Sequence, residues 1–319
     1  MNTVVEQLGL MGIIPVVVIE DEANAAPLAE ALTDGGLSTV ELTFRTEAAG
    51  GSMARIAKEL PGMLLGAGTV LTVDQVKTAV NCGAKYIVSP GLNRRVVEYC
   101  LANDIPVIPG VASPTEIGDA IDLGLHVVKF FPAEGSRGLE YLKAISAPFR
   151  FMKFVPTGGI DEGNLLSYLR LPQVLACGGS WMVKADLISG RRFDEIKRLA
   201  EQALSKMMGF RLSHVGMNNA DAIEAGAGAT MVSRLLKLPV RESEGSIFVG
   251  KEFEFLKRRY LGEHGHLAIG TNFLERAIAH FGKRGIKVKE ETMSRKDGRL
   301  SSVYLDLEIS GFAVHLLQL

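Results

Sequence analysis

The chain has 319 residues, 47% of them hydrophobic, and a formal net charge of −1 at pH 7. That length and apolar fraction suffice for one large and one small domain with buried cores. The balanced charge offers no basic surface to a nucleic acid, and the apolar stretch 8–19 is too short to span a membrane. We therefore expect no nucleic acid partner and no membrane association.

Three cysteines, Cys82, Cys100 and Cys177, lie far apart in the sequence and lack paired spacing. Unpaired thiols are typical of a reducing compartment. The stretch 8–19 also has no basic leader before it, unlike a signal peptide. We therefore predict a cytoplasmic protein whose thiols pack in the interior.

Short strands alternate with helices from Ile14 to about Ala203. This alternation predicts βαβ units and a parallel sheet, and about eight units favour a (β/α)8 TIM barrel. A doubly wound open sheet is the competitor, but Ile19-Glu20-Asp21-Glu22 after the first strand is not its glycine-rich fingerprint. The expected strands are 14–18, 39–43, 64–67, 86–89, 106–108, 127–130, 153–156 and 174–176, and the expected helices are 23–32, 53–59, 73–81, 94–102, 114–123, 139–144 and 164–169.

The pattern changes near Met207, where an amphipathic helix, 192–208, ends at Gly209. The rest predicts a small α+β domain, so we place the domains at 1–206 and 207–319. The second half of this domain has the order β-α-β-β-β, and the first half repeats it loosely, which indicates an internal duplication. The expected strands are 213–217, 246–256, 266–270, 286–291, 301–309 and 312–317, and the expected helices are 220–225 and 273–282.

Lys129 lies inside the apolar strand 127–130, just before Phe131-Pro132. Most lysines extend their ammonium group to solvent, which is the structural alternative here. Apolar neighbours on both sides, however, disfavour the charged form of a lysine and free a nucleophilic amine. Schiff-base enzymes use such an amine, so Lys129 is a candidate nucleophile.

Further polar residues fall at the ends of predicted strands, where barrel active sites lie. Glu41 and Arg45 leave the second strand, Thr69 the third and Pro90 the fourth. Simpler alternatives exist: Glu41 and Arg45 have the spacing of a surface ion pair, and Thr69 could cap the next helix.

Two glycine turns follow the last two predicted strands, Thr157-Gly158-Gly159 and Gly178-Gly179-Ser180. Barrels often hold a phosphate at these places through backbone N–H groups. The pair of turns therefore indicates a phosphorylated ligand.

Several motifs in order resemble class I 2-keto-3-deoxy-6-phosphogluconate (KDPG) and 4-hydroxy-2-oxoglutarate (KHG) aldolases, from about Val4 to Ala203. They include Glu41-Leu42-Thr43-Phe44-Arg45, Gly66-Ala67-Gly68-Thr69, Ser89-Pro90-Gly91, Ile108-Pro109-Gly110, Lys129-Phe130-Phe131-Pro132, Pro156-Thr157-Gly158-Gly159 and Gly178-Gly179-Ser180-Trp181. The resemblance implies an aldehyde-lyase that cleaves KDPG to pyruvate and glyceraldehyde 3-phosphate, and KHG to pyruvate and glyoxylate. It also implies a homotrimer and a barrel that needs no metal or organic cofactor.

The same resemblance assigns a role to each matching residue. Lys129 is expected to form the Schiff base and Glu41 to shuttle protons. Arg45 and Thr69 are expected to bind the substrate carboxylate, and Pro90 and Phe131 to wall the pocket. The residues expected to hold the rest of the substrate, with its 6-phosphate, are Thr157, Gly158, Gly159, Gly179 and Ser180.

Four strands after Met207 resemble the first and last strands of the two modules of a glyoxalase/vicinal-oxygen-chelate domain. They contain Ser213-His214-Val215, Glu254-Phe255, Gly265-His266-Leu267 and Val314-His315-Leu316. The resemblance implies a divalent metal (Zn, Ni or Fe) held by His214, Glu254, His266 and His315. His315 departs from the glutamate usual in that family, and a metal-free scaffold that pairs subunits or shields the barrel is the alternative.

A second function class remains open at this point. The chain could be a non-catalytic binding protein for a sugar phosphate or keto acid, with a sensor or oligomerisation domain at its C-terminal end. Glu41, Arg45, Thr69 and Lys129 together favour the enzyme.

Overall fold

The computed structural model describes residues 3–319, which form two compact units divided between Lys206 and Met207. Among these residues, no helix combines the length and the apolar character needed to cross a membrane. Helix α1 (Thr3–Met11) and strand β1 (Ile13–Val17) share most of the apolar stretch 8–19. Gly12, at φ 71°, ends the helix between them.

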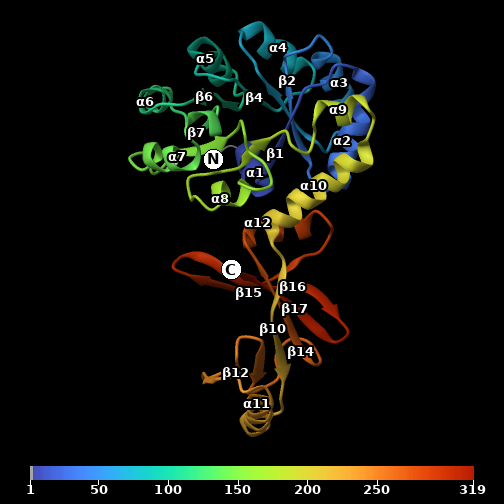
Figure 1. The fold of residues 1–319 in the computed structure, drawn as a ribbon, viewed down its shortest axis with the longest axis vertical. Helices are drawn as coiled ribbons and strands as arrows, with labels where there is room; N and C mark the ends of the chain where they lie inside the picture. The colour runs from blue at the N-terminus through green and yellow to red at the C-terminus, as the bar shows by residue number, and fades with distance from the viewer. Residues whose placement is uncertain (1–2) are drawn as a thin grey trace. The chain divides into compact units, whose positions relative to one another are not determined.

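The first unit is an α/β fold in which helices cover the outside of a curled parallel sheet (Figure 1). Its strands are β1 (Ile13–Val17), β2 (Thr39–Thr43), β3 (Leu64–Gly68), β4 (Tyr86–Val88), β5 (Val107–Ile108), β6 (Gly110–Val111), β7 (Val127–Phe130), β8 (Lys153–Pro156) and β9 (Cys177–Gly179). Its helices are α1 (Thr3–Met11), α2 (Ala25–Asp34), α3 (Ala49–Glu59), α4 (Val73–Asn81), α5 (Arg94–Ala102), α6 (Pro114–Asp122), α7 (Gly138–Ser146), α8 (Leu165–Leu169), α9 (Ala185–Ser189) and α10 (Phe193–Met208). The predicted parallel alternation of strands and helices is therefore confirmed.

Strand pairing runs through almost the whole sheet. Six strands have the order β5-β4-β3-β2-β1-β9, and three more have the order β6-β7-β8. Pro109 alone separates β5 from β6, and a parallel bridge between Thr157 and Gly178 links the end of β8 to β9. The parallel strands therefore direct their carboxyl ends to one side, where the polar residues cluster.

Side chains on the inner face of this sheet share one apolar cluster. It includes Ile14, Leu64, Tyr86, Val127 and Val155, each from a different strand. Helix α1 adds Val5 and Leu8 to the cluster, although the sequence did not predict this helix. Because successive strand residues alternate between faces, Lys129 shares the inner face with Val127.

Local sequence sets the starts of several outer helices. Thr72 and Gln75 form a capping box at α4, and Asn93 caps α5. Ser113 caps α6, which has Pro114 in its first turn. Such caps satisfy N–H groups that otherwise lack a helical partner.

The strand expected at 174–176 is wrong, because β9 lies at Cys177–Gly179. Gly178 and Gly179 therefore belong to a strand rather than to the turn after it. A Cβ atom on Gly178 would lie 2.4 Å from Thr157 Oγ1, so the glycine permits the close approach of the two chain segments.

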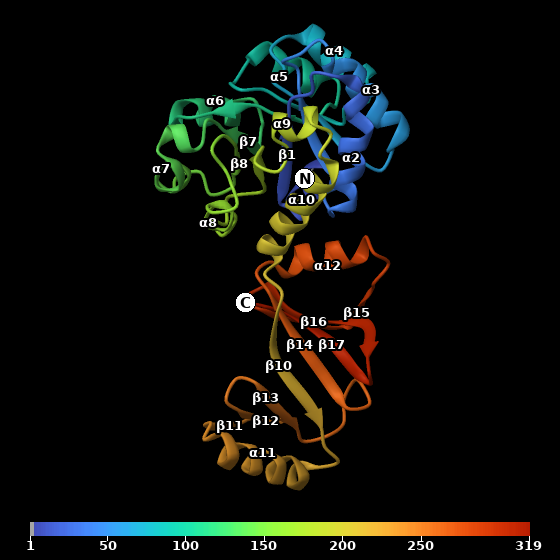
Figure 2. The ribbon, with the colours of Figure 1, turned by 45° about the vertical axis from the view of Figure 1, so that its right-hand side comes forward.

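The second unit contains one eight-stranded sheet and two helices (Figure 2). Its elements are β10 (Arg211–Asn218), α11 (Ala222–Leu236), β11 (Val240–Glu242), β12 (Ser246–Val249), β13 (Phe253–Leu256), β14 (Gly265–Thr271), α12 (Leu274–Gly282), β15 (Val288–Lys296), β16 (Arg299–Ile309) and β17 (Phe312–Gln318). Both halves have the order β-α-β-β-β, as the sequence indicated. The expected strand 246–256 is split in two, and α11 is longer than expected.

The sheet order, β11-β12-β13-β10-β14-β17-β16-β15, gives the two halves a pseudo-twofold relation. Strands β10 and β14 pair antiparallel at the centre, with His214 opposite Ala268 and Gly216 opposite His266. Each central strand pairs in parallel with the last strand of its own module, β13 or β17. The duplication therefore brings the first and last strands of both modules together.

Candidate active site and a histidine cluster

Lys129 and Glu41 form an ion pair inside the first unit. Lys129 Nζ lies 3.2 Å from Glu41 Oε1, and the two side chains are only 7% and 3% exposed. Replacing a buried ion pair by apolar residues often leaves stability unchanged or raises it. The pair is therefore better explained by chemistry than by stability.

Glycines on strand β3 make room for the groups around Glu41. A Cβ atom on Gly68 would lie 2.3 Å from Glu41 Oε1, and one on Gly66 would overlap the ring of Tyr86. Tyr86 is fully buried; burial and the charge of Glu41 raise the pKa of its hydroxyl far above the ordinary value. A neutral Tyr86 thus lies beside the acid–base pair, a neighbour that sequence reasoning missed.

Arg45 and Thr69 are held together at the ends of their strands. Arg45 Nε donates a hydrogen bond to Thr69 Oγ1 over 3.2 Å, and the arginine side chain is exposed. Glu41 pairs with Lys129, so the simple surface pair with Arg45 is not what the structure contains. The helix cap is Thr72, whereas Thr69 has a left-handed backbone with φ 56°.

Phe131 and Pro90 lie near the lysine. Lys129 Nζ is 5.1 Å from the centroid of the Phe131 ring. Gly110 pairs with Lys129 across the strands, and a Cβ atom on Gly110 would lie 2.1 Å from the Pro90 carbonyl oxygen. Both residues are thus positioned beside the strand that carries the lysine.

The glycine turn Thr157-Gly158-Gly159 lies next to Phe131. Gly158 and Gly159 have φ values of 95° and 83°, which glycine adopts without strain. A Cβ atom on Gly158 would lie 3.3 Å from the Phe131 ring. Gly179 is buried in β9, and Ser180 follows it as an exposed residue.

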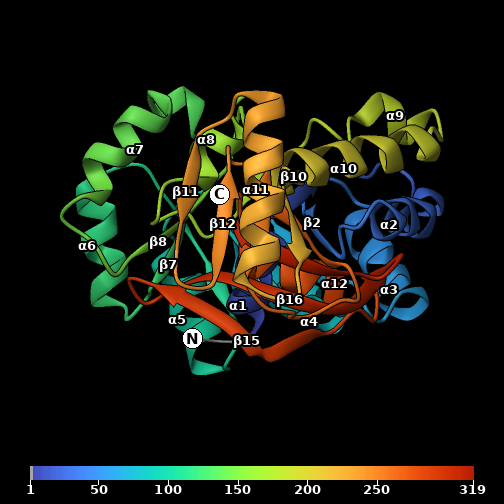
Figure 3. The same cartoon turned by 90° about the horizontal axis from the view of Figure 1, so that it is seen from below.

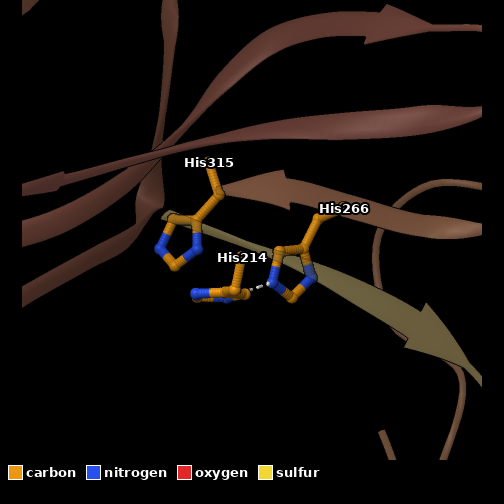
Figure 4. A group of neighbouring side chains, drawn as sticks. All are labelled: His214, His266 and His315. Carbon is orange, nitrogen blue, oxygen red and sulfur yellow. Dashed lines mark hydrogen bonds between the residues drawn. The ribbon is translucent and has the colours of Figure 1, made fainter. Parts of the chain in front are cut away.

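The second unit has its own polar cluster, formed by His214, His266 and His315 (Figure 4). One ring nitrogen from each lies within 4.8 Å of those of the others. The Nε2 atoms of His214 and His266 are 3.1 Å apart and lie 3.3 and 3.2 Å from Glu254 Oε2. The structure therefore brings together all four residues expected to bind a metal.

The electrostatics of this cluster favour a charged Glu254 carboxylate and a neutral His315 ring. Burial alone would raise the pKa of Glu254, but hydrogen bonds with His214, His266 and Ser246 hold it well below its usual range. Burial, together with the neighbouring His266 and His214, lowers the pKa of His315 to about 3. Tyr304 stacks on the His315 ring, with centroids 4.3 Å apart.

Known proteins resemble the first part of the chain. A family model described as KDPG and KHG aldolase matches residues 4–199. The 2-dehydro-3-deoxy-phosphogluconate aldolase of Treponema pallidum is 48% identical over 204 residues, which are 64% of this chain and 97% of that protein. The KHG/KDPG aldolase of Escherichia coli is 41% identical over 192 residues, 60% of this chain and 90% of the relative.

Solved structures agree with these relatives. The KDPG aldolase of Legionella pneumophila, captured with pyruvate as a covalent carbinolamine, has a TM-score of 0.62 and 39% identity. It matches 64% of this chain and 99% of its own length. The KDPG aldolase of Zymomonas mobilis ZM4 with 3-phosphoglycerate has a TM-score of 0.60 and 40% identity, over 64% and 95% of the two chains.

These likenesses support the enzyme rather than the non-catalytic binding protein. They cover the unit that contains the Lys129–Glu41 pair, and the family model ends before the second unit begins. The chain belongs to the KDPG and KHG aldolase family.

Proposed function

We propose that this class I aldolase cleaves KDPG to pyruvate and glyceraldehyde 3-phosphate through a Schiff base on Lys129, and that KHG is a second substrate. The observation that carries the proposal is the buried contact between Lys129 Nζ and Glu41 Oε1. It supplies a sheltered amine with an acid–base group next to it. The relatives named for KDPG and KHG cleavage support the choice of substrate.

The reaction begins when Lys129 passes a proton to Glu41 and its freed amine attacks the C2 carbonyl carbon, which gives a carbinolamine once a proton moves from the nitrogen to the oxygen. Proton transfer through Glu41 lets the carbinolamine lose water and become a protonated imine. That imine accepts the electron pair of the C3–C4 bond while Glu41 takes the C4 hydroxyl proton. Glyceraldehyde 3-phosphate leaves, and protonation and hydrolysis of the remaining enamine release pyruvate and the free lysine.

The surrounding residues bind and orient the substrate. Arg45, with Thr69 beside it, offers a planar donor group suited to a carboxylate. Phe131 and Pro90 shield the lysine from water. Backbone N–H groups at the glycine-rich segments suit the 6-phosphate; these segments contain Thr157, Gly158, Gly159, Gly179 and Ser180.

The direct test is release of pyruvate from KDPG by the purified full chain, followed with a lactate dehydrogenase coupling system. We expect turnover that a chelator leaves unchanged, because the barrel chemistry needs no metal. Tight binding of KDPG without turnover would instead support the binding-protein alternative. Chelator-sensitive cleavage would replace the Schiff base with metal-dependent chemistry.

We further propose that the curled sheet of the first unit is a (β/α)8 barrel in which β5 and β6 are two parts of one strand. The near-complete circuit of parallel pairing supports this view. A homotrimer is proposed from the family resemblance. A cytoplasmic location is proposed because no disulfide joins any two of the three cysteines, all of which are among the described residues.

For residues 207–319 we propose a glyoxalase/vicinal-oxygen-chelate-like domain that binds one divalent metal. The duplicated β-α-β-β-β order and the convergence of His214, Glu254, His266 and His315 support it. The donor set suits Zn, Ni or Fe. Three of the four donors, His214 Nε2, His266 Nε2 and Glu254 Oε2, already lie within 3.3 Å of one another, as expected where one ion is to be bound.

Metal analysis of the purified chain tests this second proposal. We expect about one Zn, Ni or Fe per chain, lost in His266→Asn and retained in His264→Asn. His264 is exposed and lies two residues from His266, so it is a matched control. A chain that takes up none of these metals after reconstitution would make the cluster a metal-free scaffold.

A further inference from the structure

Helix α11 exposes an unusually apolar side. The side chains of Ile223, Met231 and Leu235 are 82%, 70% and 77% exposed. Together with Ala227 they recur every four residues and therefore form one ridge along the helix. We call these four residues the α11 stripe.

The opposite side of α11 is already packed on its own sheet, over β12 and β13 (Figure 3). Ala225 and Ala229 join a buried cluster with Ile247 and Phe255. A helix that is apolar on both sides is normally buried on both sides. The α11 stripe is therefore an interface rather than an ordinary exposed surface.

Helix α12 is the counterpart of α11 in the second module. Its sequence shows that a helix in this position does not need apolar residues at the positions of the stripe. The sequence offset between His214 and His266 is the same as that between the helix N-caps, Asp221 and Phe273. At this offset, Ile223 corresponds to Glu275 and Met231 to Lys283, both exposed and charged. The apolar stripe is thus a particular feature of α11.

We propose that the α11 stripe binds the same stripe on a second copy of this chain, with the two helices antiparallel. Charge complementarity supports this occupant, because exposed Glu224 lies near the start of the helix and exposed Arg234 near its end. A twofold axis at the level of Ala229 sets Glu224 of one copy at the height of Arg234 of the other.

The same axis matches the apolar residues. It sets Ile223 at the height of Leu235, and the small Ala227 at the height of the large Met231. One patch thus complements itself, as a twofold contact requires.

The size of the stripe predicts the strength of the contact. A standard interface buries about 800 Å² on each partner, and a helix of this length spans only about 22 Å. Leu236 and Val240, which follow the stripe in the sequence, are also exposed. We therefore expect an association that depends on protein concentration.

Sedimentation equilibrium of the full chain over a wide concentration range tests the proposal. The wild type is expected to reach a higher particle mass than Leu235→Glu, by an amount that grows with protein concentration. Ala222→Glu adds the same charge to α11 outside the stripe and should associate like the wild type. Pyruvate release by each variant, with the far-ultraviolet spectrum, checks that it is folded.

Charge reversal gives an independent measurement. Arg234→Glu should weaken the association, and adding Glu224→Arg to it should restore it. Equal particle masses for the wild type and Leu235→Glu at all concentrations would overturn the proposal. It would also be wrong if the wild type failed to associate through α11 and instead co-sedimented with neutral phospholipid vesicles.

Discussion

Gly68 faces the carboxylate of Glu41 so closely that a Cβ atom on the glycine would lie 2.3 Å from Oε1. Because Glu41 is buried and paired with Lys129, it has little room to move away. The substitution Gly68→Ala should therefore displace the acid–base group and reduce kcat strongly, while the chain stays folded. Gly62→Ala, at a position with open space around the added methyl group, is the control and should retain activity.

Glu41→Gln removes the proton acceptor but keeps the shape of the side chain. We expect kcat for pyruvate release to fall by about 10²–10⁴-fold, the usual contribution of a general acid–base. Glu47→Gln changes an exposed glutamate after the same strand and should retain wild-type kcat. A Glu41→Gln enzyme with normal kcat would assign proton transfer to another group.

Arg45→Ala should act mainly on substrate binding, since the guanidinium is proposed to hold the carboxylate. Loss of a charge-assisted contact of about 1.5–3 kcal/mol predicts a KM higher by about 10–100-fold. Arg55→Ala, on the exposed side of α3, should leave KM unchanged. An unchanged KM in Arg45→Ala would remove this residue from the carboxylate site.

His280 gives the second unit a pH-dependent stability. Burial, together with the charges of Arg284 and Lys283, lowers the pKa of His280 to about 4. An unfolded histidine binds its proton near pH 6.5, so the unfolded state gains stability as the pH falls below that value. The contribution of His280 is thus present above about pH 6.5 and is lost as the pH falls through about 4.

Urea unfolding of the full chain at pH 7.5 and at pH 5 tests whether stability falls as the pH falls. The free energy of unfolding should be lower at pH 5, and His280→Gln should reduce the difference. His264→Gln, at an exposed position, should not. A difference unchanged in His280→Gln would show that other groups cause the acid sensitivity.

Sequence patterns predicted regular elements well where a single local rule applied. Strands 39–43, 127–130 and 153–156 were predicted to the residue, because apolar, largely β-branched or aromatic runs end there at polar or proline-containing turns. Lys129 and Glu41 could be predicted as site residues because each lies in a short motif that resembles one of the aldolase family.

Other features depend on tertiary contacts that no local pattern encodes. Strand β9 contains two glycines, and its position depends on the approach to Thr157 and the pairing with β1. Helix α11 runs through Gly226 and Gly228, well beyond the end predicted at residue 225. Gly228 is needed there because a Cβ atom would lie 2.7 Å from Phe255. Tyr86 is brought near Glu41 by the strand register, in which Gly66 of β3 pairs with both residues.

Reductive trapping is the most direct test of whether Lys129 forms a Schiff base with the keto acid. The wild type is treated with pyruvate and sodium borohydride, and the modified peptide is identified by mass spectrometry. We expect one reduced pyruvate adduct on Lys129, none in Lys129→Met, and loss of activity in the trapped enzyme. An unlabelled Lys129 under conditions that trap a known Schiff-base aldolase, or an adduct on another lysine, would contradict it.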